Sequence, residues 1–494
     1  MDRDDLERRM GARSFARLMG DWRPASGGGR LAEALADRVR LLVLDGRLPL
    51  QTRVPAEREL AVALEVSRTT VAAAYDTLRD AGVLRSRRGA GSWTQLPAEP
   101  SGGASSAPYA PVGDLSLFDL AHAAPSAPTE PMRAAAAAAV HDLDAHLGFH
   151  GYDLRGLLPL RTAIAERCTA RGLPTTVDQI LVTAGAQHAI ALVVLALTGP
   201  GDRVVVEHPS YPNALDAIRA HGARAVPLPL GPGPGRTWSW DMDLLAATIR
   251  DAAPRLMYLI PDFQNPTGAV LDDAGRERLV ELARRTSTPL LVDETMSEVS
   301  LRDEPIRPVA AFGAADSPLV LTVGSASKSF WGGLRVGWIR TSAPMVRRLA
   351  ATRVQMDLGN PVLEQLVVTR LLADATAIAA ARRIELTAAR DHLQDRIATL
   401  FPGWVPTRPQ GGMSLWIELG EAVSSRLASA ARRHDLLISA GPRYGIDGAF
   451  ERYLRLPFTL RTDRMDMALE RLLTTWRELD RVGPLQDIEP VAVA

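Results

Sequence analysis

Residues 322–340 read Thr-Val-Gly-Ser-Ala-Ser-Lys-Ser-Phe-Trp-Gly-Gly-Leu-Arg-Val-Gly-Trp-Ile-Arg, and Lys328 within them is the only lysine in the chain. With 57 lysines and arginines in total, the remaining 56 basic residues are arginine. Guanidinium keeps its proton in a protein, whereas a desolvated lysine can become a neutral amine and attack a carbonyl. Lys328 is therefore a candidate nucleophile. The alternative is an arginine-biased composition with one lysine left on the surface by chance.

The neighbours of Lys328 favour the chemical role. Ser325 and Ser327 precede it, after the apolar run at residues 319–321, and Arg335 follows seven residues later. Short hydroxyls can donate hydrogen bonds to an anion, and a guanidinium supplies a fixed positive charge. These residues predict a site for an aldehyde cofactor that carries a phosphate.

Length and composition describe an ordinary globular protein of more than one domain. The 494 residues exceed the roughly 250–300 at which a single core stops growing. Formal net charge is zero, so binding to nucleic acid would require a local basic patch. The single cysteine, Cys168, excludes a disulfide framework and a cysteine-based zinc site and fits a reducing cytosol. Without an apolar signal core or a run of roughly 18–20 apolar residues, we expect a cytoplasmic protein with no membrane association and no metal site.

From residue 117 onward, short apolar runs alternate with helical patterns. This alternation predicts a mostly parallel, helix-covered sheet with ligands at the carboxyl ends of its strands. The expected helices include residues 186–197 and 272–285. The expected strands are residues 179–183, 203–207, 224–228, 256–260, 289–293, 319–323 and 336–340.

Four polar motifs follow these expected strands. Residues 183–187 open a helix whose backbone N–H groups can hold a phosphate, and Tyr211 can stack on a flat ring. Asn265 offers an amide at a proline-containing turn, and an ionised Asp293 would keep a pyridine nitrogen protonated. Each motif has a plain alternative, as a loop, a core aromatic, a common turn or a helix cap. Their order and shared location before Lys328 favour one common site.

The first hundred residues predict a small helical module. Residues 1–29 are charged and then glycine-rich, and we interpret them as a loosely ordered extension. Apolar spacing predicts helices over residues 31–44, 56–64 and 67–81, the last with Ser67 as its N-cap. A small hairpin with a basic tip follows at residues 82–91.

Two short helices joined by a tight turn suit insertion into the major groove of DNA, with Arg68, Thr69 and Thr70 exposed at the start of the second. Residues 27–96 hold 11 Arg against 8 Asp and Glu, so the module is modestly basic. The arginines of the hairpin tip would lie against phosphates, and Arg68 could reach a base edge or a phosphate. The alternative is a helical oligomerisation domain with solvated arginines.

Residues 97–116 are dense in Pro, Gly, Ser and Ala and predict a flexible linker. The expected organisation is then an extension at 1–29, a DNA-binding domain at 30–96, the linker, a large domain at 117–485 and a tail at 486–494.

The segment Arg53-Val-Pro-Ala-Glu-Arg-Glu-Leu-Ala61 and the segment Leu64-Glu-Val-Ser-Arg-Thr-Thr-Val71 resemble the winged helix-turn-helix of GntR-type regulators. The resemblance covers the whole module. It departs from the family at Gln51, where Gly is usual, and at Ala56, where Ser is usual. It implies binding to double-stranded promoter DNA, and the residues we expect to contact DNA are Arg53, Arg58, Ser67, Arg68, Thr69, Thr70, Arg87, Arg88 and Gly89.

Over roughly residues 115–485, the order of motifs resembles fold-type I pyridoxal-phosphate (PLP) enzymes of the aspartate aminotransferase kind. The resemblance implies an α/β domain with a smaller C-terminal α+β subdomain. It implies that Lys328 forms a Schiff base with the cofactor, while Asp293 pairs with the pyridine nitrogen. It also implies that Asn265 lies near the ring hydroxyl and that Tyr211 stacks on the ring. Arg455 would bind the carboxylate of a substrate or effector. The residues implied around the phosphate are Gly185, Ala186, Gln187, Ser325, Ser327 and Arg335.

A GntR-type head joined to this body resembles the MocR/GabR-type transcription regulators. We expect a homodimer that senses PLP or a PLP–amine adduct and whose heads address paired promoter half-sites. Thr295 or Met296 stands where these regulators commonly have a Tyr that bonds the ring hydroxyl, which argues against efficient transamination. Asn213 stands where GABA-responsive members have Arg. The alternatives are an active aminotransferase with an accessory DNA-binding head, and a body that has lost the cofactor and only dimerises.

Overall fold

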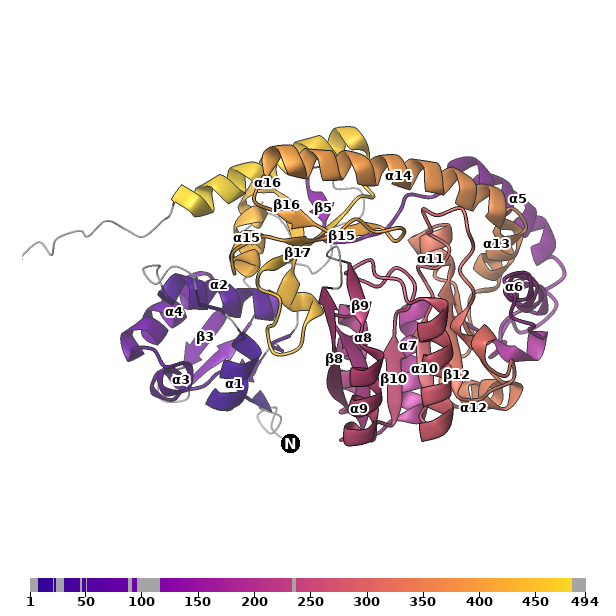
Figure 1. Ribbon diagram of the computed structural model, residues 1–494, viewed down its shortest axis with the longest axis horizontal. Coiled ribbons are helices and arrows are strands. Elements are labelled where there is room, and N and C mark those ends of the chain that lie inside the picture. The colour runs from indigo at the N-terminus through magenta and orange to yellow at the C-terminus, as the bar shows by residue number, and fades with distance from the viewer. Residues whose placement is uncertain are drawn as a thin grey trace, which may run out of the picture. The chain divides into compact units, whose positions relative to one another are not determined.

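The computed structural model describes residues 8–20, 22–23, 31–44, 47–49, 51–87, 91–95, 116–232 and 237–481. The chain forms two compact units (Figure 1). Unit 1 comprises Met1–His122, Leu393–Pro406 and Trp416–Ala494, and unit 2 comprises Ala123–His392 and Thr407–Leu415. Across the described ranges, none of the helices combines the length and apolar character that a membrane span requires.

The N-terminal part of unit 1 is a winged helix-turn-helix, as predicted. Helices α2 (Leu31–Leu44), α3 (Glu57–Leu64) and α4 (Arg68–Asp80) enclose an apolar core. Ser67 caps α4, because its side chain accepts the Thr70 N–H over 3.0 Å. The wing is the hairpin β3 (Leu84–Arg87) and β4 (Gly91–Thr94), in a sheet of order β1-β2-β4-β3 with β1 (Arg8–Arg9) and β2 (Thr52–Arg53).

The stretch that we expected to be a loosely ordered extension contains a helix, α1 (Ala12–Met19). Phe15 and Met19 are fully buried and pack in the core of the head. They lie four residues apart and therefore share one helix face. The expectation is wrong for residues 12–19, because Arg13 and Arg17 made this short segment look hydrophilic.

The rest of unit 1 is a smaller α+β subdomain, which we call the C-terminal subdomain. Its five strands have the order β14-β15-β17-β16-β5, and β5, from residues 118–120, pairs in parallel with β16. Its elements are β5 (Phe118–Leu120), β14 (Val405–Pro406), β15 (Ser414–Glu418), α15 (Ser424–Ala431), β16 (Leu436–Ala440), β17 (Tyr453–Pro457) and α16 (Thr462–Arg481).

Unit 2 is built on an eight-stranded sheet of order β6-β13-β12-β11-β10-β7-β8-β9. The strands are β6 (Ile180–Thr183), β7 (Arg203–His208), β8 (Arg224–Pro232), β9 (Trp238–Trp240), β10 (Leu256–Leu259), β11 (Leu290–Asp293), β12 (Val320–Ser325) and β13 (Gly337–Arg340). All seven strands predicted in this unit are present. The central pairs are parallel, whereas β13 runs antiparallel to both its neighbours and β9 antiparallel to β8.

Helices connect these strands and lie along the sheet (Figure 1). The central strands β10, β11 and β12 are buried along their whole length, so their largely apolar sequences do not alternate with an exposed polar face. The helices are α5 (Thr129–Leu143), α6 (Leu158–Ala170), α7 (Ala186–Leu197), α8 (Pro212–Ala220), α9 (Met242–Ala252), α10 (Asp273–Thr286), α11 (Ala326–Ser329), α12 (Ala343–Arg353) and α13 (Val362–Ala373), followed by α14 (Ala375–Leu400). The predicted polar motifs fall in the connections at the carboxyl ends of the strands.

Candidate functional site

Lys328 lies on the short helix α11, directly after β12. Ser325 caps this helix, because its hydroxyl accepts the Ser327 N–H over 3.2 Å. The Lys328 side chain is partly buried, and its Nζ donates to the carbonyl of Ala123 over 2.5 Å. The amine is thus held at the carboxyl edge of the sheet by a backbone acceptor.

Asp293 ends the neighbouring strand β11 and is buried. Its Oδ2 accepts the Tyr258 hydroxyl over 2.8 Å, and its Oδ1 accepts the Thr295 N–H over 3.0 Å. Burial raises the pKa of Asp293, while these hydrogen bonds and the charge of Lys328 act in the opposite direction. Burial and the Asp293 charge raise the pKa of Tyr258, which keeps its hydroxyl a donor. Sequence reasoning missed Tyr258, although a lone Tyr in an apolar strand was a usable signal.

A buried carboxylate that the sequence did not single out, Glu207, holds the turns beside the site. It accepts the Ile260 N–H over 3.0 Å and the Trp240 indole N–H over 2.8 Å. Gln264 donates to Glu207 over 3.1 Å and to the Pro209 carbonyl over 2.8 Å. Burial raises the pKa of Glu207 to about 7, although the hydrogen bonds oppose the shift. This cluster fixes the turn before Tyr211 and the turn that carries Asn265, whose side chain is half-buried.

Tyr211 precedes helix α8 and is linked to the loop before α7. The Asn213 amide donates to the Tyr211 hydroxyl over 3.0 Å, and the Gln187 amide donates to the Asn213 carbonyl over 3.0 Å. The Gln187 Oε1 atom is buried and has no hydrogen-bond partner among the residues that the structure describes. A buried acceptor without a partner is costly unless a ligand or water supplies a donor.

The turn at Gly185 and Ala186 opens helix α7 and contacts Arg335. Gly185 has φ +90°, and a Cβ there would lie 2.7 Å from the Arg335 guanidinium. Arg335 Nη2 donates to the Ala184 carbonyl over 2.8 Å, and the side chain is otherwise exposed. Since the first N–H groups of a helix have no partner within it, the start of α7 and this guanidinium form a cradle suited to an anion.

Arg455 lies on β17, in unit 1. Its side chain is buried, donates to the Ala121 carbonyl and lies 5.1 Å over the ring of Tyr444. Its predicted role toward a carboxylate remains a prediction.

In the head, the predicted DNA contacts lie mostly on the surface. Arg58, Ser67, Arg68 and Thr69 are exposed, and Thr70 is half-buried. The Arg68 guanidinium lies 3.4 Å from the Glu57 carboxylate, and its side chain is 72% exposed. Both residues start their helices, so this contact joins the starts of α3 and α4.

The other predicted DNA contacts lie on β2, at Arg53, and in the segment between β3 and β4. Arg53 is half-buried, and its guanidinium lies 5.8 Å from the centre of the Trp93 ring. Arg88, Gly89 and the side chain of Arg87 lie outside the described residues.

Two family models match the chain, and together they cover both parts of it. The model of aminotransferase class I and II matches residues 117–472. The model of bacterial regulatory proteins, gntR family, matches residues 31–93.

The proteins similar to this chain include both transcription regulators and aminotransferases. The uncharacterized HTH-type transcriptional regulator YisV of Bacillus subtilis is 25% identical over 447 residues, which cover 84% of this chain and 90% of YisV. The arginine–pyruvate transaminase AruH of Pseudomonas aeruginosa is 32% identical over 336 residues, covering 67% of this chain and 83% of AruH. The solved structure of LysN, an alpha-aminoadipate aminotransferase from Thermus thermophilus, superposes with a TM-score of 0.68 at 26% identity, covering 74% of this chain and 94% of LysN.

Fold, site and comparisons define a class of protein in which an aminotransferase-like domain is fused to a DNA-binding domain. The chain belongs to the aminotransferase class I and II family, and its GntR-type head gives it the architecture of the MocR-type transcription regulators. The similarity to YisV spans head and body, whereas the similarity to AruH spans only about two thirds of the chain.

Proposed function

We propose that the protein regulates transcription by binding PLP, or PLP condensed with a small amine, in unit 2 and promoter DNA through its head. The observation that carries this proposal is the placement of Lys328 beside Asp293, in a chain whose first domain is of the GntR type. PLP dependence is a property of the aminotransferase class I and II family. LysN is described in complex with a phosphopyridoxyl amino acid, which supports the same ligand class here.

The residues present fit PLP. The cradle between Gly185 and Arg335 would be filled by any side chain at position 185, which suits a phosphate. The buried Gln187 Oε1 offers an acceptor to a bound ligand or its water. Asp293 is a buried carboxylate on which the positive charge of Lys328 acts, and a protonated ring nitrogen would provide a second positive charge.

When bound, PLP supplies an aldehyde for a primary amine and a ring that withdraws electrons. The protein would contribute the amine of Lys328 and the carboxylate of Asp293, which Tyr258 orients by its 2.8 Å hydrogen bond. Tyr211 would stack on the ring and Asn265 would lie near its hydroxyl. The phosphate would be held by Gly185, Ala186, Gln187, Ser325, Ser327 and Arg335.

Sensing is favoured over turnover by the segment after Asp293. Thr295 uses both its N–H and its hydroxyl for Asp293, and the buried side chain of Met296 has no donor to offer the ring hydroxyl. A site that binds the cofactor but lacks a donor to the ring hydroxyl has less control over the electron distribution in the cofactor ring. We propose Arg455 as the residue that binds an effector carboxylate.

Paired half-sites on DNA would require two heads, so we propose that the protein acts as a homodimer. Ligand binding would change how the two heads address DNA, with a coupling free energy of about 1–3 kcal/mol.

The single lysine makes the cofactor site directly testable. Borohydride reduction of the PLP-loaded protein should fix one phosphopyridoxyl group on the peptide that contains Lys328, detected by mass spectrometry. The Lys328→Ala variant offers no other lysine and should carry no such group on this peptide, while retaining its fold by circular dichroism. Equal labelling of the variant would refute the assignment.

A working aminotransferase with an accessory head is the second candidate. It is favoured by the 32% identity to AruH. The two candidates are separated by mixing PLP-loaded protein with amino acids and following the conversion of the cofactor to its amine form. Rapid multiple turnovers with a keto-acid acceptor would support the enzyme, and slow or absent conversion would support the sensor.

A further inference from the structure

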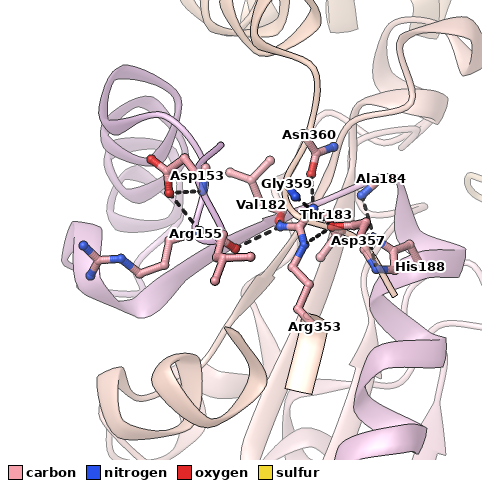
Figure 2. Close-up of polar contacts among 12 residues, drawn as sticks. Asp153, Arg155, Val182, Thr183, Ala184, His188, Arg353, Asp357, Gly359 and Asn360 are labelled. Carbon is pink, nitrogen blue, oxygen red and sulfur yellow. Dashed lines mark hydrogen bonds and ion pairs between the residues drawn. The ribbon is translucent and has the colours of Figure 1, made fainter. Parts of the chain in front are cut away.

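A buried polar network adjoins the phosphate cradle, and none of the roles above uses it (Figure 2). It joins His188, on the first turn of α7, to Asp357 and Arg353. We propose that His188 is a positioning residue for the cofactor phosphate: its Nδ1 holds the turn at residues 184–187 in the binding conformation, and protonation of its ring releases that turn. This inference rests on the proposed PLP site.

The hydrogen bonds of His188 determine its tautomer. Its Nδ1 lies 3.0 Å from the backbone nitrogen of Ala184. A backbone N–H can only donate, so Nδ1 must be the unprotonated acceptor, and the neutral ring carries its hydrogen on Nε2. Nε2 faces the Asp357 carboxylate, 3.4 Å from Oδ2. Nδ1 is therefore held by a hydrogen bond from the turn, whereas Nε2 faces an anion at ion-pair distance and has no hydrogen-bond partner among the described residues.

Arg353 fixes Asp357 and the end of the strand before the turn. This arginine is fully buried, and its Nε lies 2.5 Å from Asp357 Oδ1. Its Nη1 donates to the Val182 carbonyl over 2.6 Å and to the Leu154 carbonyl over 3.0 Å. Figure 2 shows the Arg353 guanidinium between Val182 and Asp357, with His188 on the far side of Asp357. The carboxylate that faces His188 is thus held by an ion pair whose arginine is fully buried, although the Asp357 side chain itself is 32% exposed.

The same network reaches the second half of the cradle. Arg353 Nη2 donates to Asn360 Oδ1 over 2.7 Å, and Asn360 Nδ2 lies 3.4 Å from the Arg335 carbonyl. Arg335 in turn donates to the carbonyl of Ala184, the residue whose N–H is bonded to His188. Ala184 is therefore held from both sides, its N–H by His188 and its carbonyl by Arg335.

A second proton on His188 would place an N–H against the Ala184 N–H and would remove the acceptor. The charged groups that act on the ring are Asp357, which favours the second proton, and Arg353 and Arg335, which disfavour it. Burial, the largest effect, lowers the pKa of His188 from its ordinary value and so favours the neutral ring. The unfolded chain protonates His188 more readily than the folded chain does. The contribution of His188 to the free energy of unfolding is therefore fully present above about pH 6.5 and declines as the pH falls.

The test compares the affinities of PLP and pyridoxal, which lacks the phosphate, for the complete chain. Binding is followed by the change in absorbance and tryptophan fluorescence at fixed ionic strength, between pH 5.5 and 8. His188→Leu removes the acceptor for Ala184. His188→Asn keeps an oxygen acceptor near the position of Nδ1 but does not titrate.

At pH 8 we expect His188→Leu to lose about tenfold in PLP affinity and little in pyridoxal affinity, because one buried backbone donor loses its partner. His188→Asn should bind PLP nearly as the wild type does. Below pH 6.5 the ratio of PLP to pyridoxal affinity should fall more steeply in the wild type than in His188→Asn. Because Asn does not titrate, the pH dependence in His188→Asn measures the ionisation of the phosphate alone.

Three results would overturn the inference. His188→Leu could bind both PLP and pyridoxal as tightly as the wild type does. It could instead lose affinity for PLP and pyridoxal by the same factor, which would indicate general damage to the fold. His188→Asn could show the same pH profile as the wild type. A wild type that binds PLP no better than pyridoxal would instead contradict the proposed phosphate site itself, and the two failures are thereby distinguished.

Discussion

At the scale of single residues, the proposed cofactor site depends on the buried carboxylate of Asp293. Asp293 and Lys328 were predictable from sequence, because each polar residue closely follows an apolar strand. Tyr258 was not, because its contact with Asp293 depends on the register between β10 and β11. Tyr258 pairs with Leu291, and Asp293 is the next residue along β11 that points to the same face. The local sequence does not show that β10 pairs with β11, nor in which register the two strands pair.

Tyr258→Phe tests whether this hydroxyl matters for the cofactor. The Asp293 carboxylate loses a hydrogen bond of 2.8 Å, and its pKa should rise further. A bond to a charged acceptor is worth about 1.5–3 kcal/mol, so PLP affinity should fall by roughly tenfold or more. Fluorescence titration with PLP measures this loss.

Tyr75→Phe is the matched control, because the buried Tyr75 hydroxyl donates over 2.9 Å to the Pro55 carbonyl in the head. It removes a comparable hydrogen bond in the DNA-binding domain and should leave PLP affinity unchanged. Equal PLP affinities in the two variants would show that Tyr258 does not support the site.

At the scale of elements, local signals predicted the head well. The helix at 31–44 was predicted with the bounds that the structure has, and the recognition helix was predicted from Ser67 and the stripe of Val71, Ala74, Tyr75 and Leu78. Helix α1 was missed because only two apolar residues mark its buried face. Their partners lie in helices further along the chain, which a local pattern does not reveal.

Ser67 and Arg68 should separate stability from DNA recognition. Ser67→Ala removes the cap of α4 and should lower the free energy of unfolding of the head by about 1 kcal/mol, measured by urea denaturation. Arg68→Ala should leave stability nearly unchanged, because its ion pair with Glu57 is largely exposed. It should nevertheless weaken binding to promoter DNA, measured by fluorescence anisotropy. Wild-type DNA affinity in Arg68→Ala would contradict the assignment of α4 as the recognition helix.

At the scale of the whole molecule, the order of motifs predicted both parts of the chain but not how they join. We expected residues 97–116 to be a flexible linker, and residues 96–115 lie outside the described residues. The head nevertheless forms one compact unit with the C-terminal subdomain. Arg38 of α2 is buried and donates to Ser425 over 2.8 Å and to Glu451 over 3.2 Å. Such a contact between residues 413 apart has no local sequence signal.

This buried pair joins the head to the segment that leads to Arg455. Glu451 lies four residues before Arg455 and shortly ahead of strand β17. On a neighbouring segment, Arg47 donates to the carbonyl of Pro442, two residues from the Tyr444 ring under Arg455. We propose that binding of a carboxylate at Arg455 reaches the head through these contacts.

A double-mutant cycle with Arg38→Met and Glu451→Gln tests the link. Each single change removes one charge of a buried ion pair and should cost about 3–5 kcal/mol in the free energy of unfolding, whereas the double variant should lose less than the sum. The variants should also bind PLP normally, while the effect on DNA affinity of PLP condensed with an amino acid, which carries a carboxylate for Arg455, shrinks. The exposed pair Arg461 and Asp463 is the control and should show no coupling. Additive losses for Arg38 and Glu451 would refute the link.

The most direct test of a PLP-sensing regulator is the affinity of the wild-type protein for the DNA upstream of its own gene, with and without PLP. Salt must be held constant, because contacts to phosphates make the affinity depend steeply on it. We predict sequence-specific binding whose dissociation constant shifts by about 5–150-fold when PLP is added, and no shift in Lys328→Ala. Specific binding with the same dissociation constant in both conditions would contradict the sensing role.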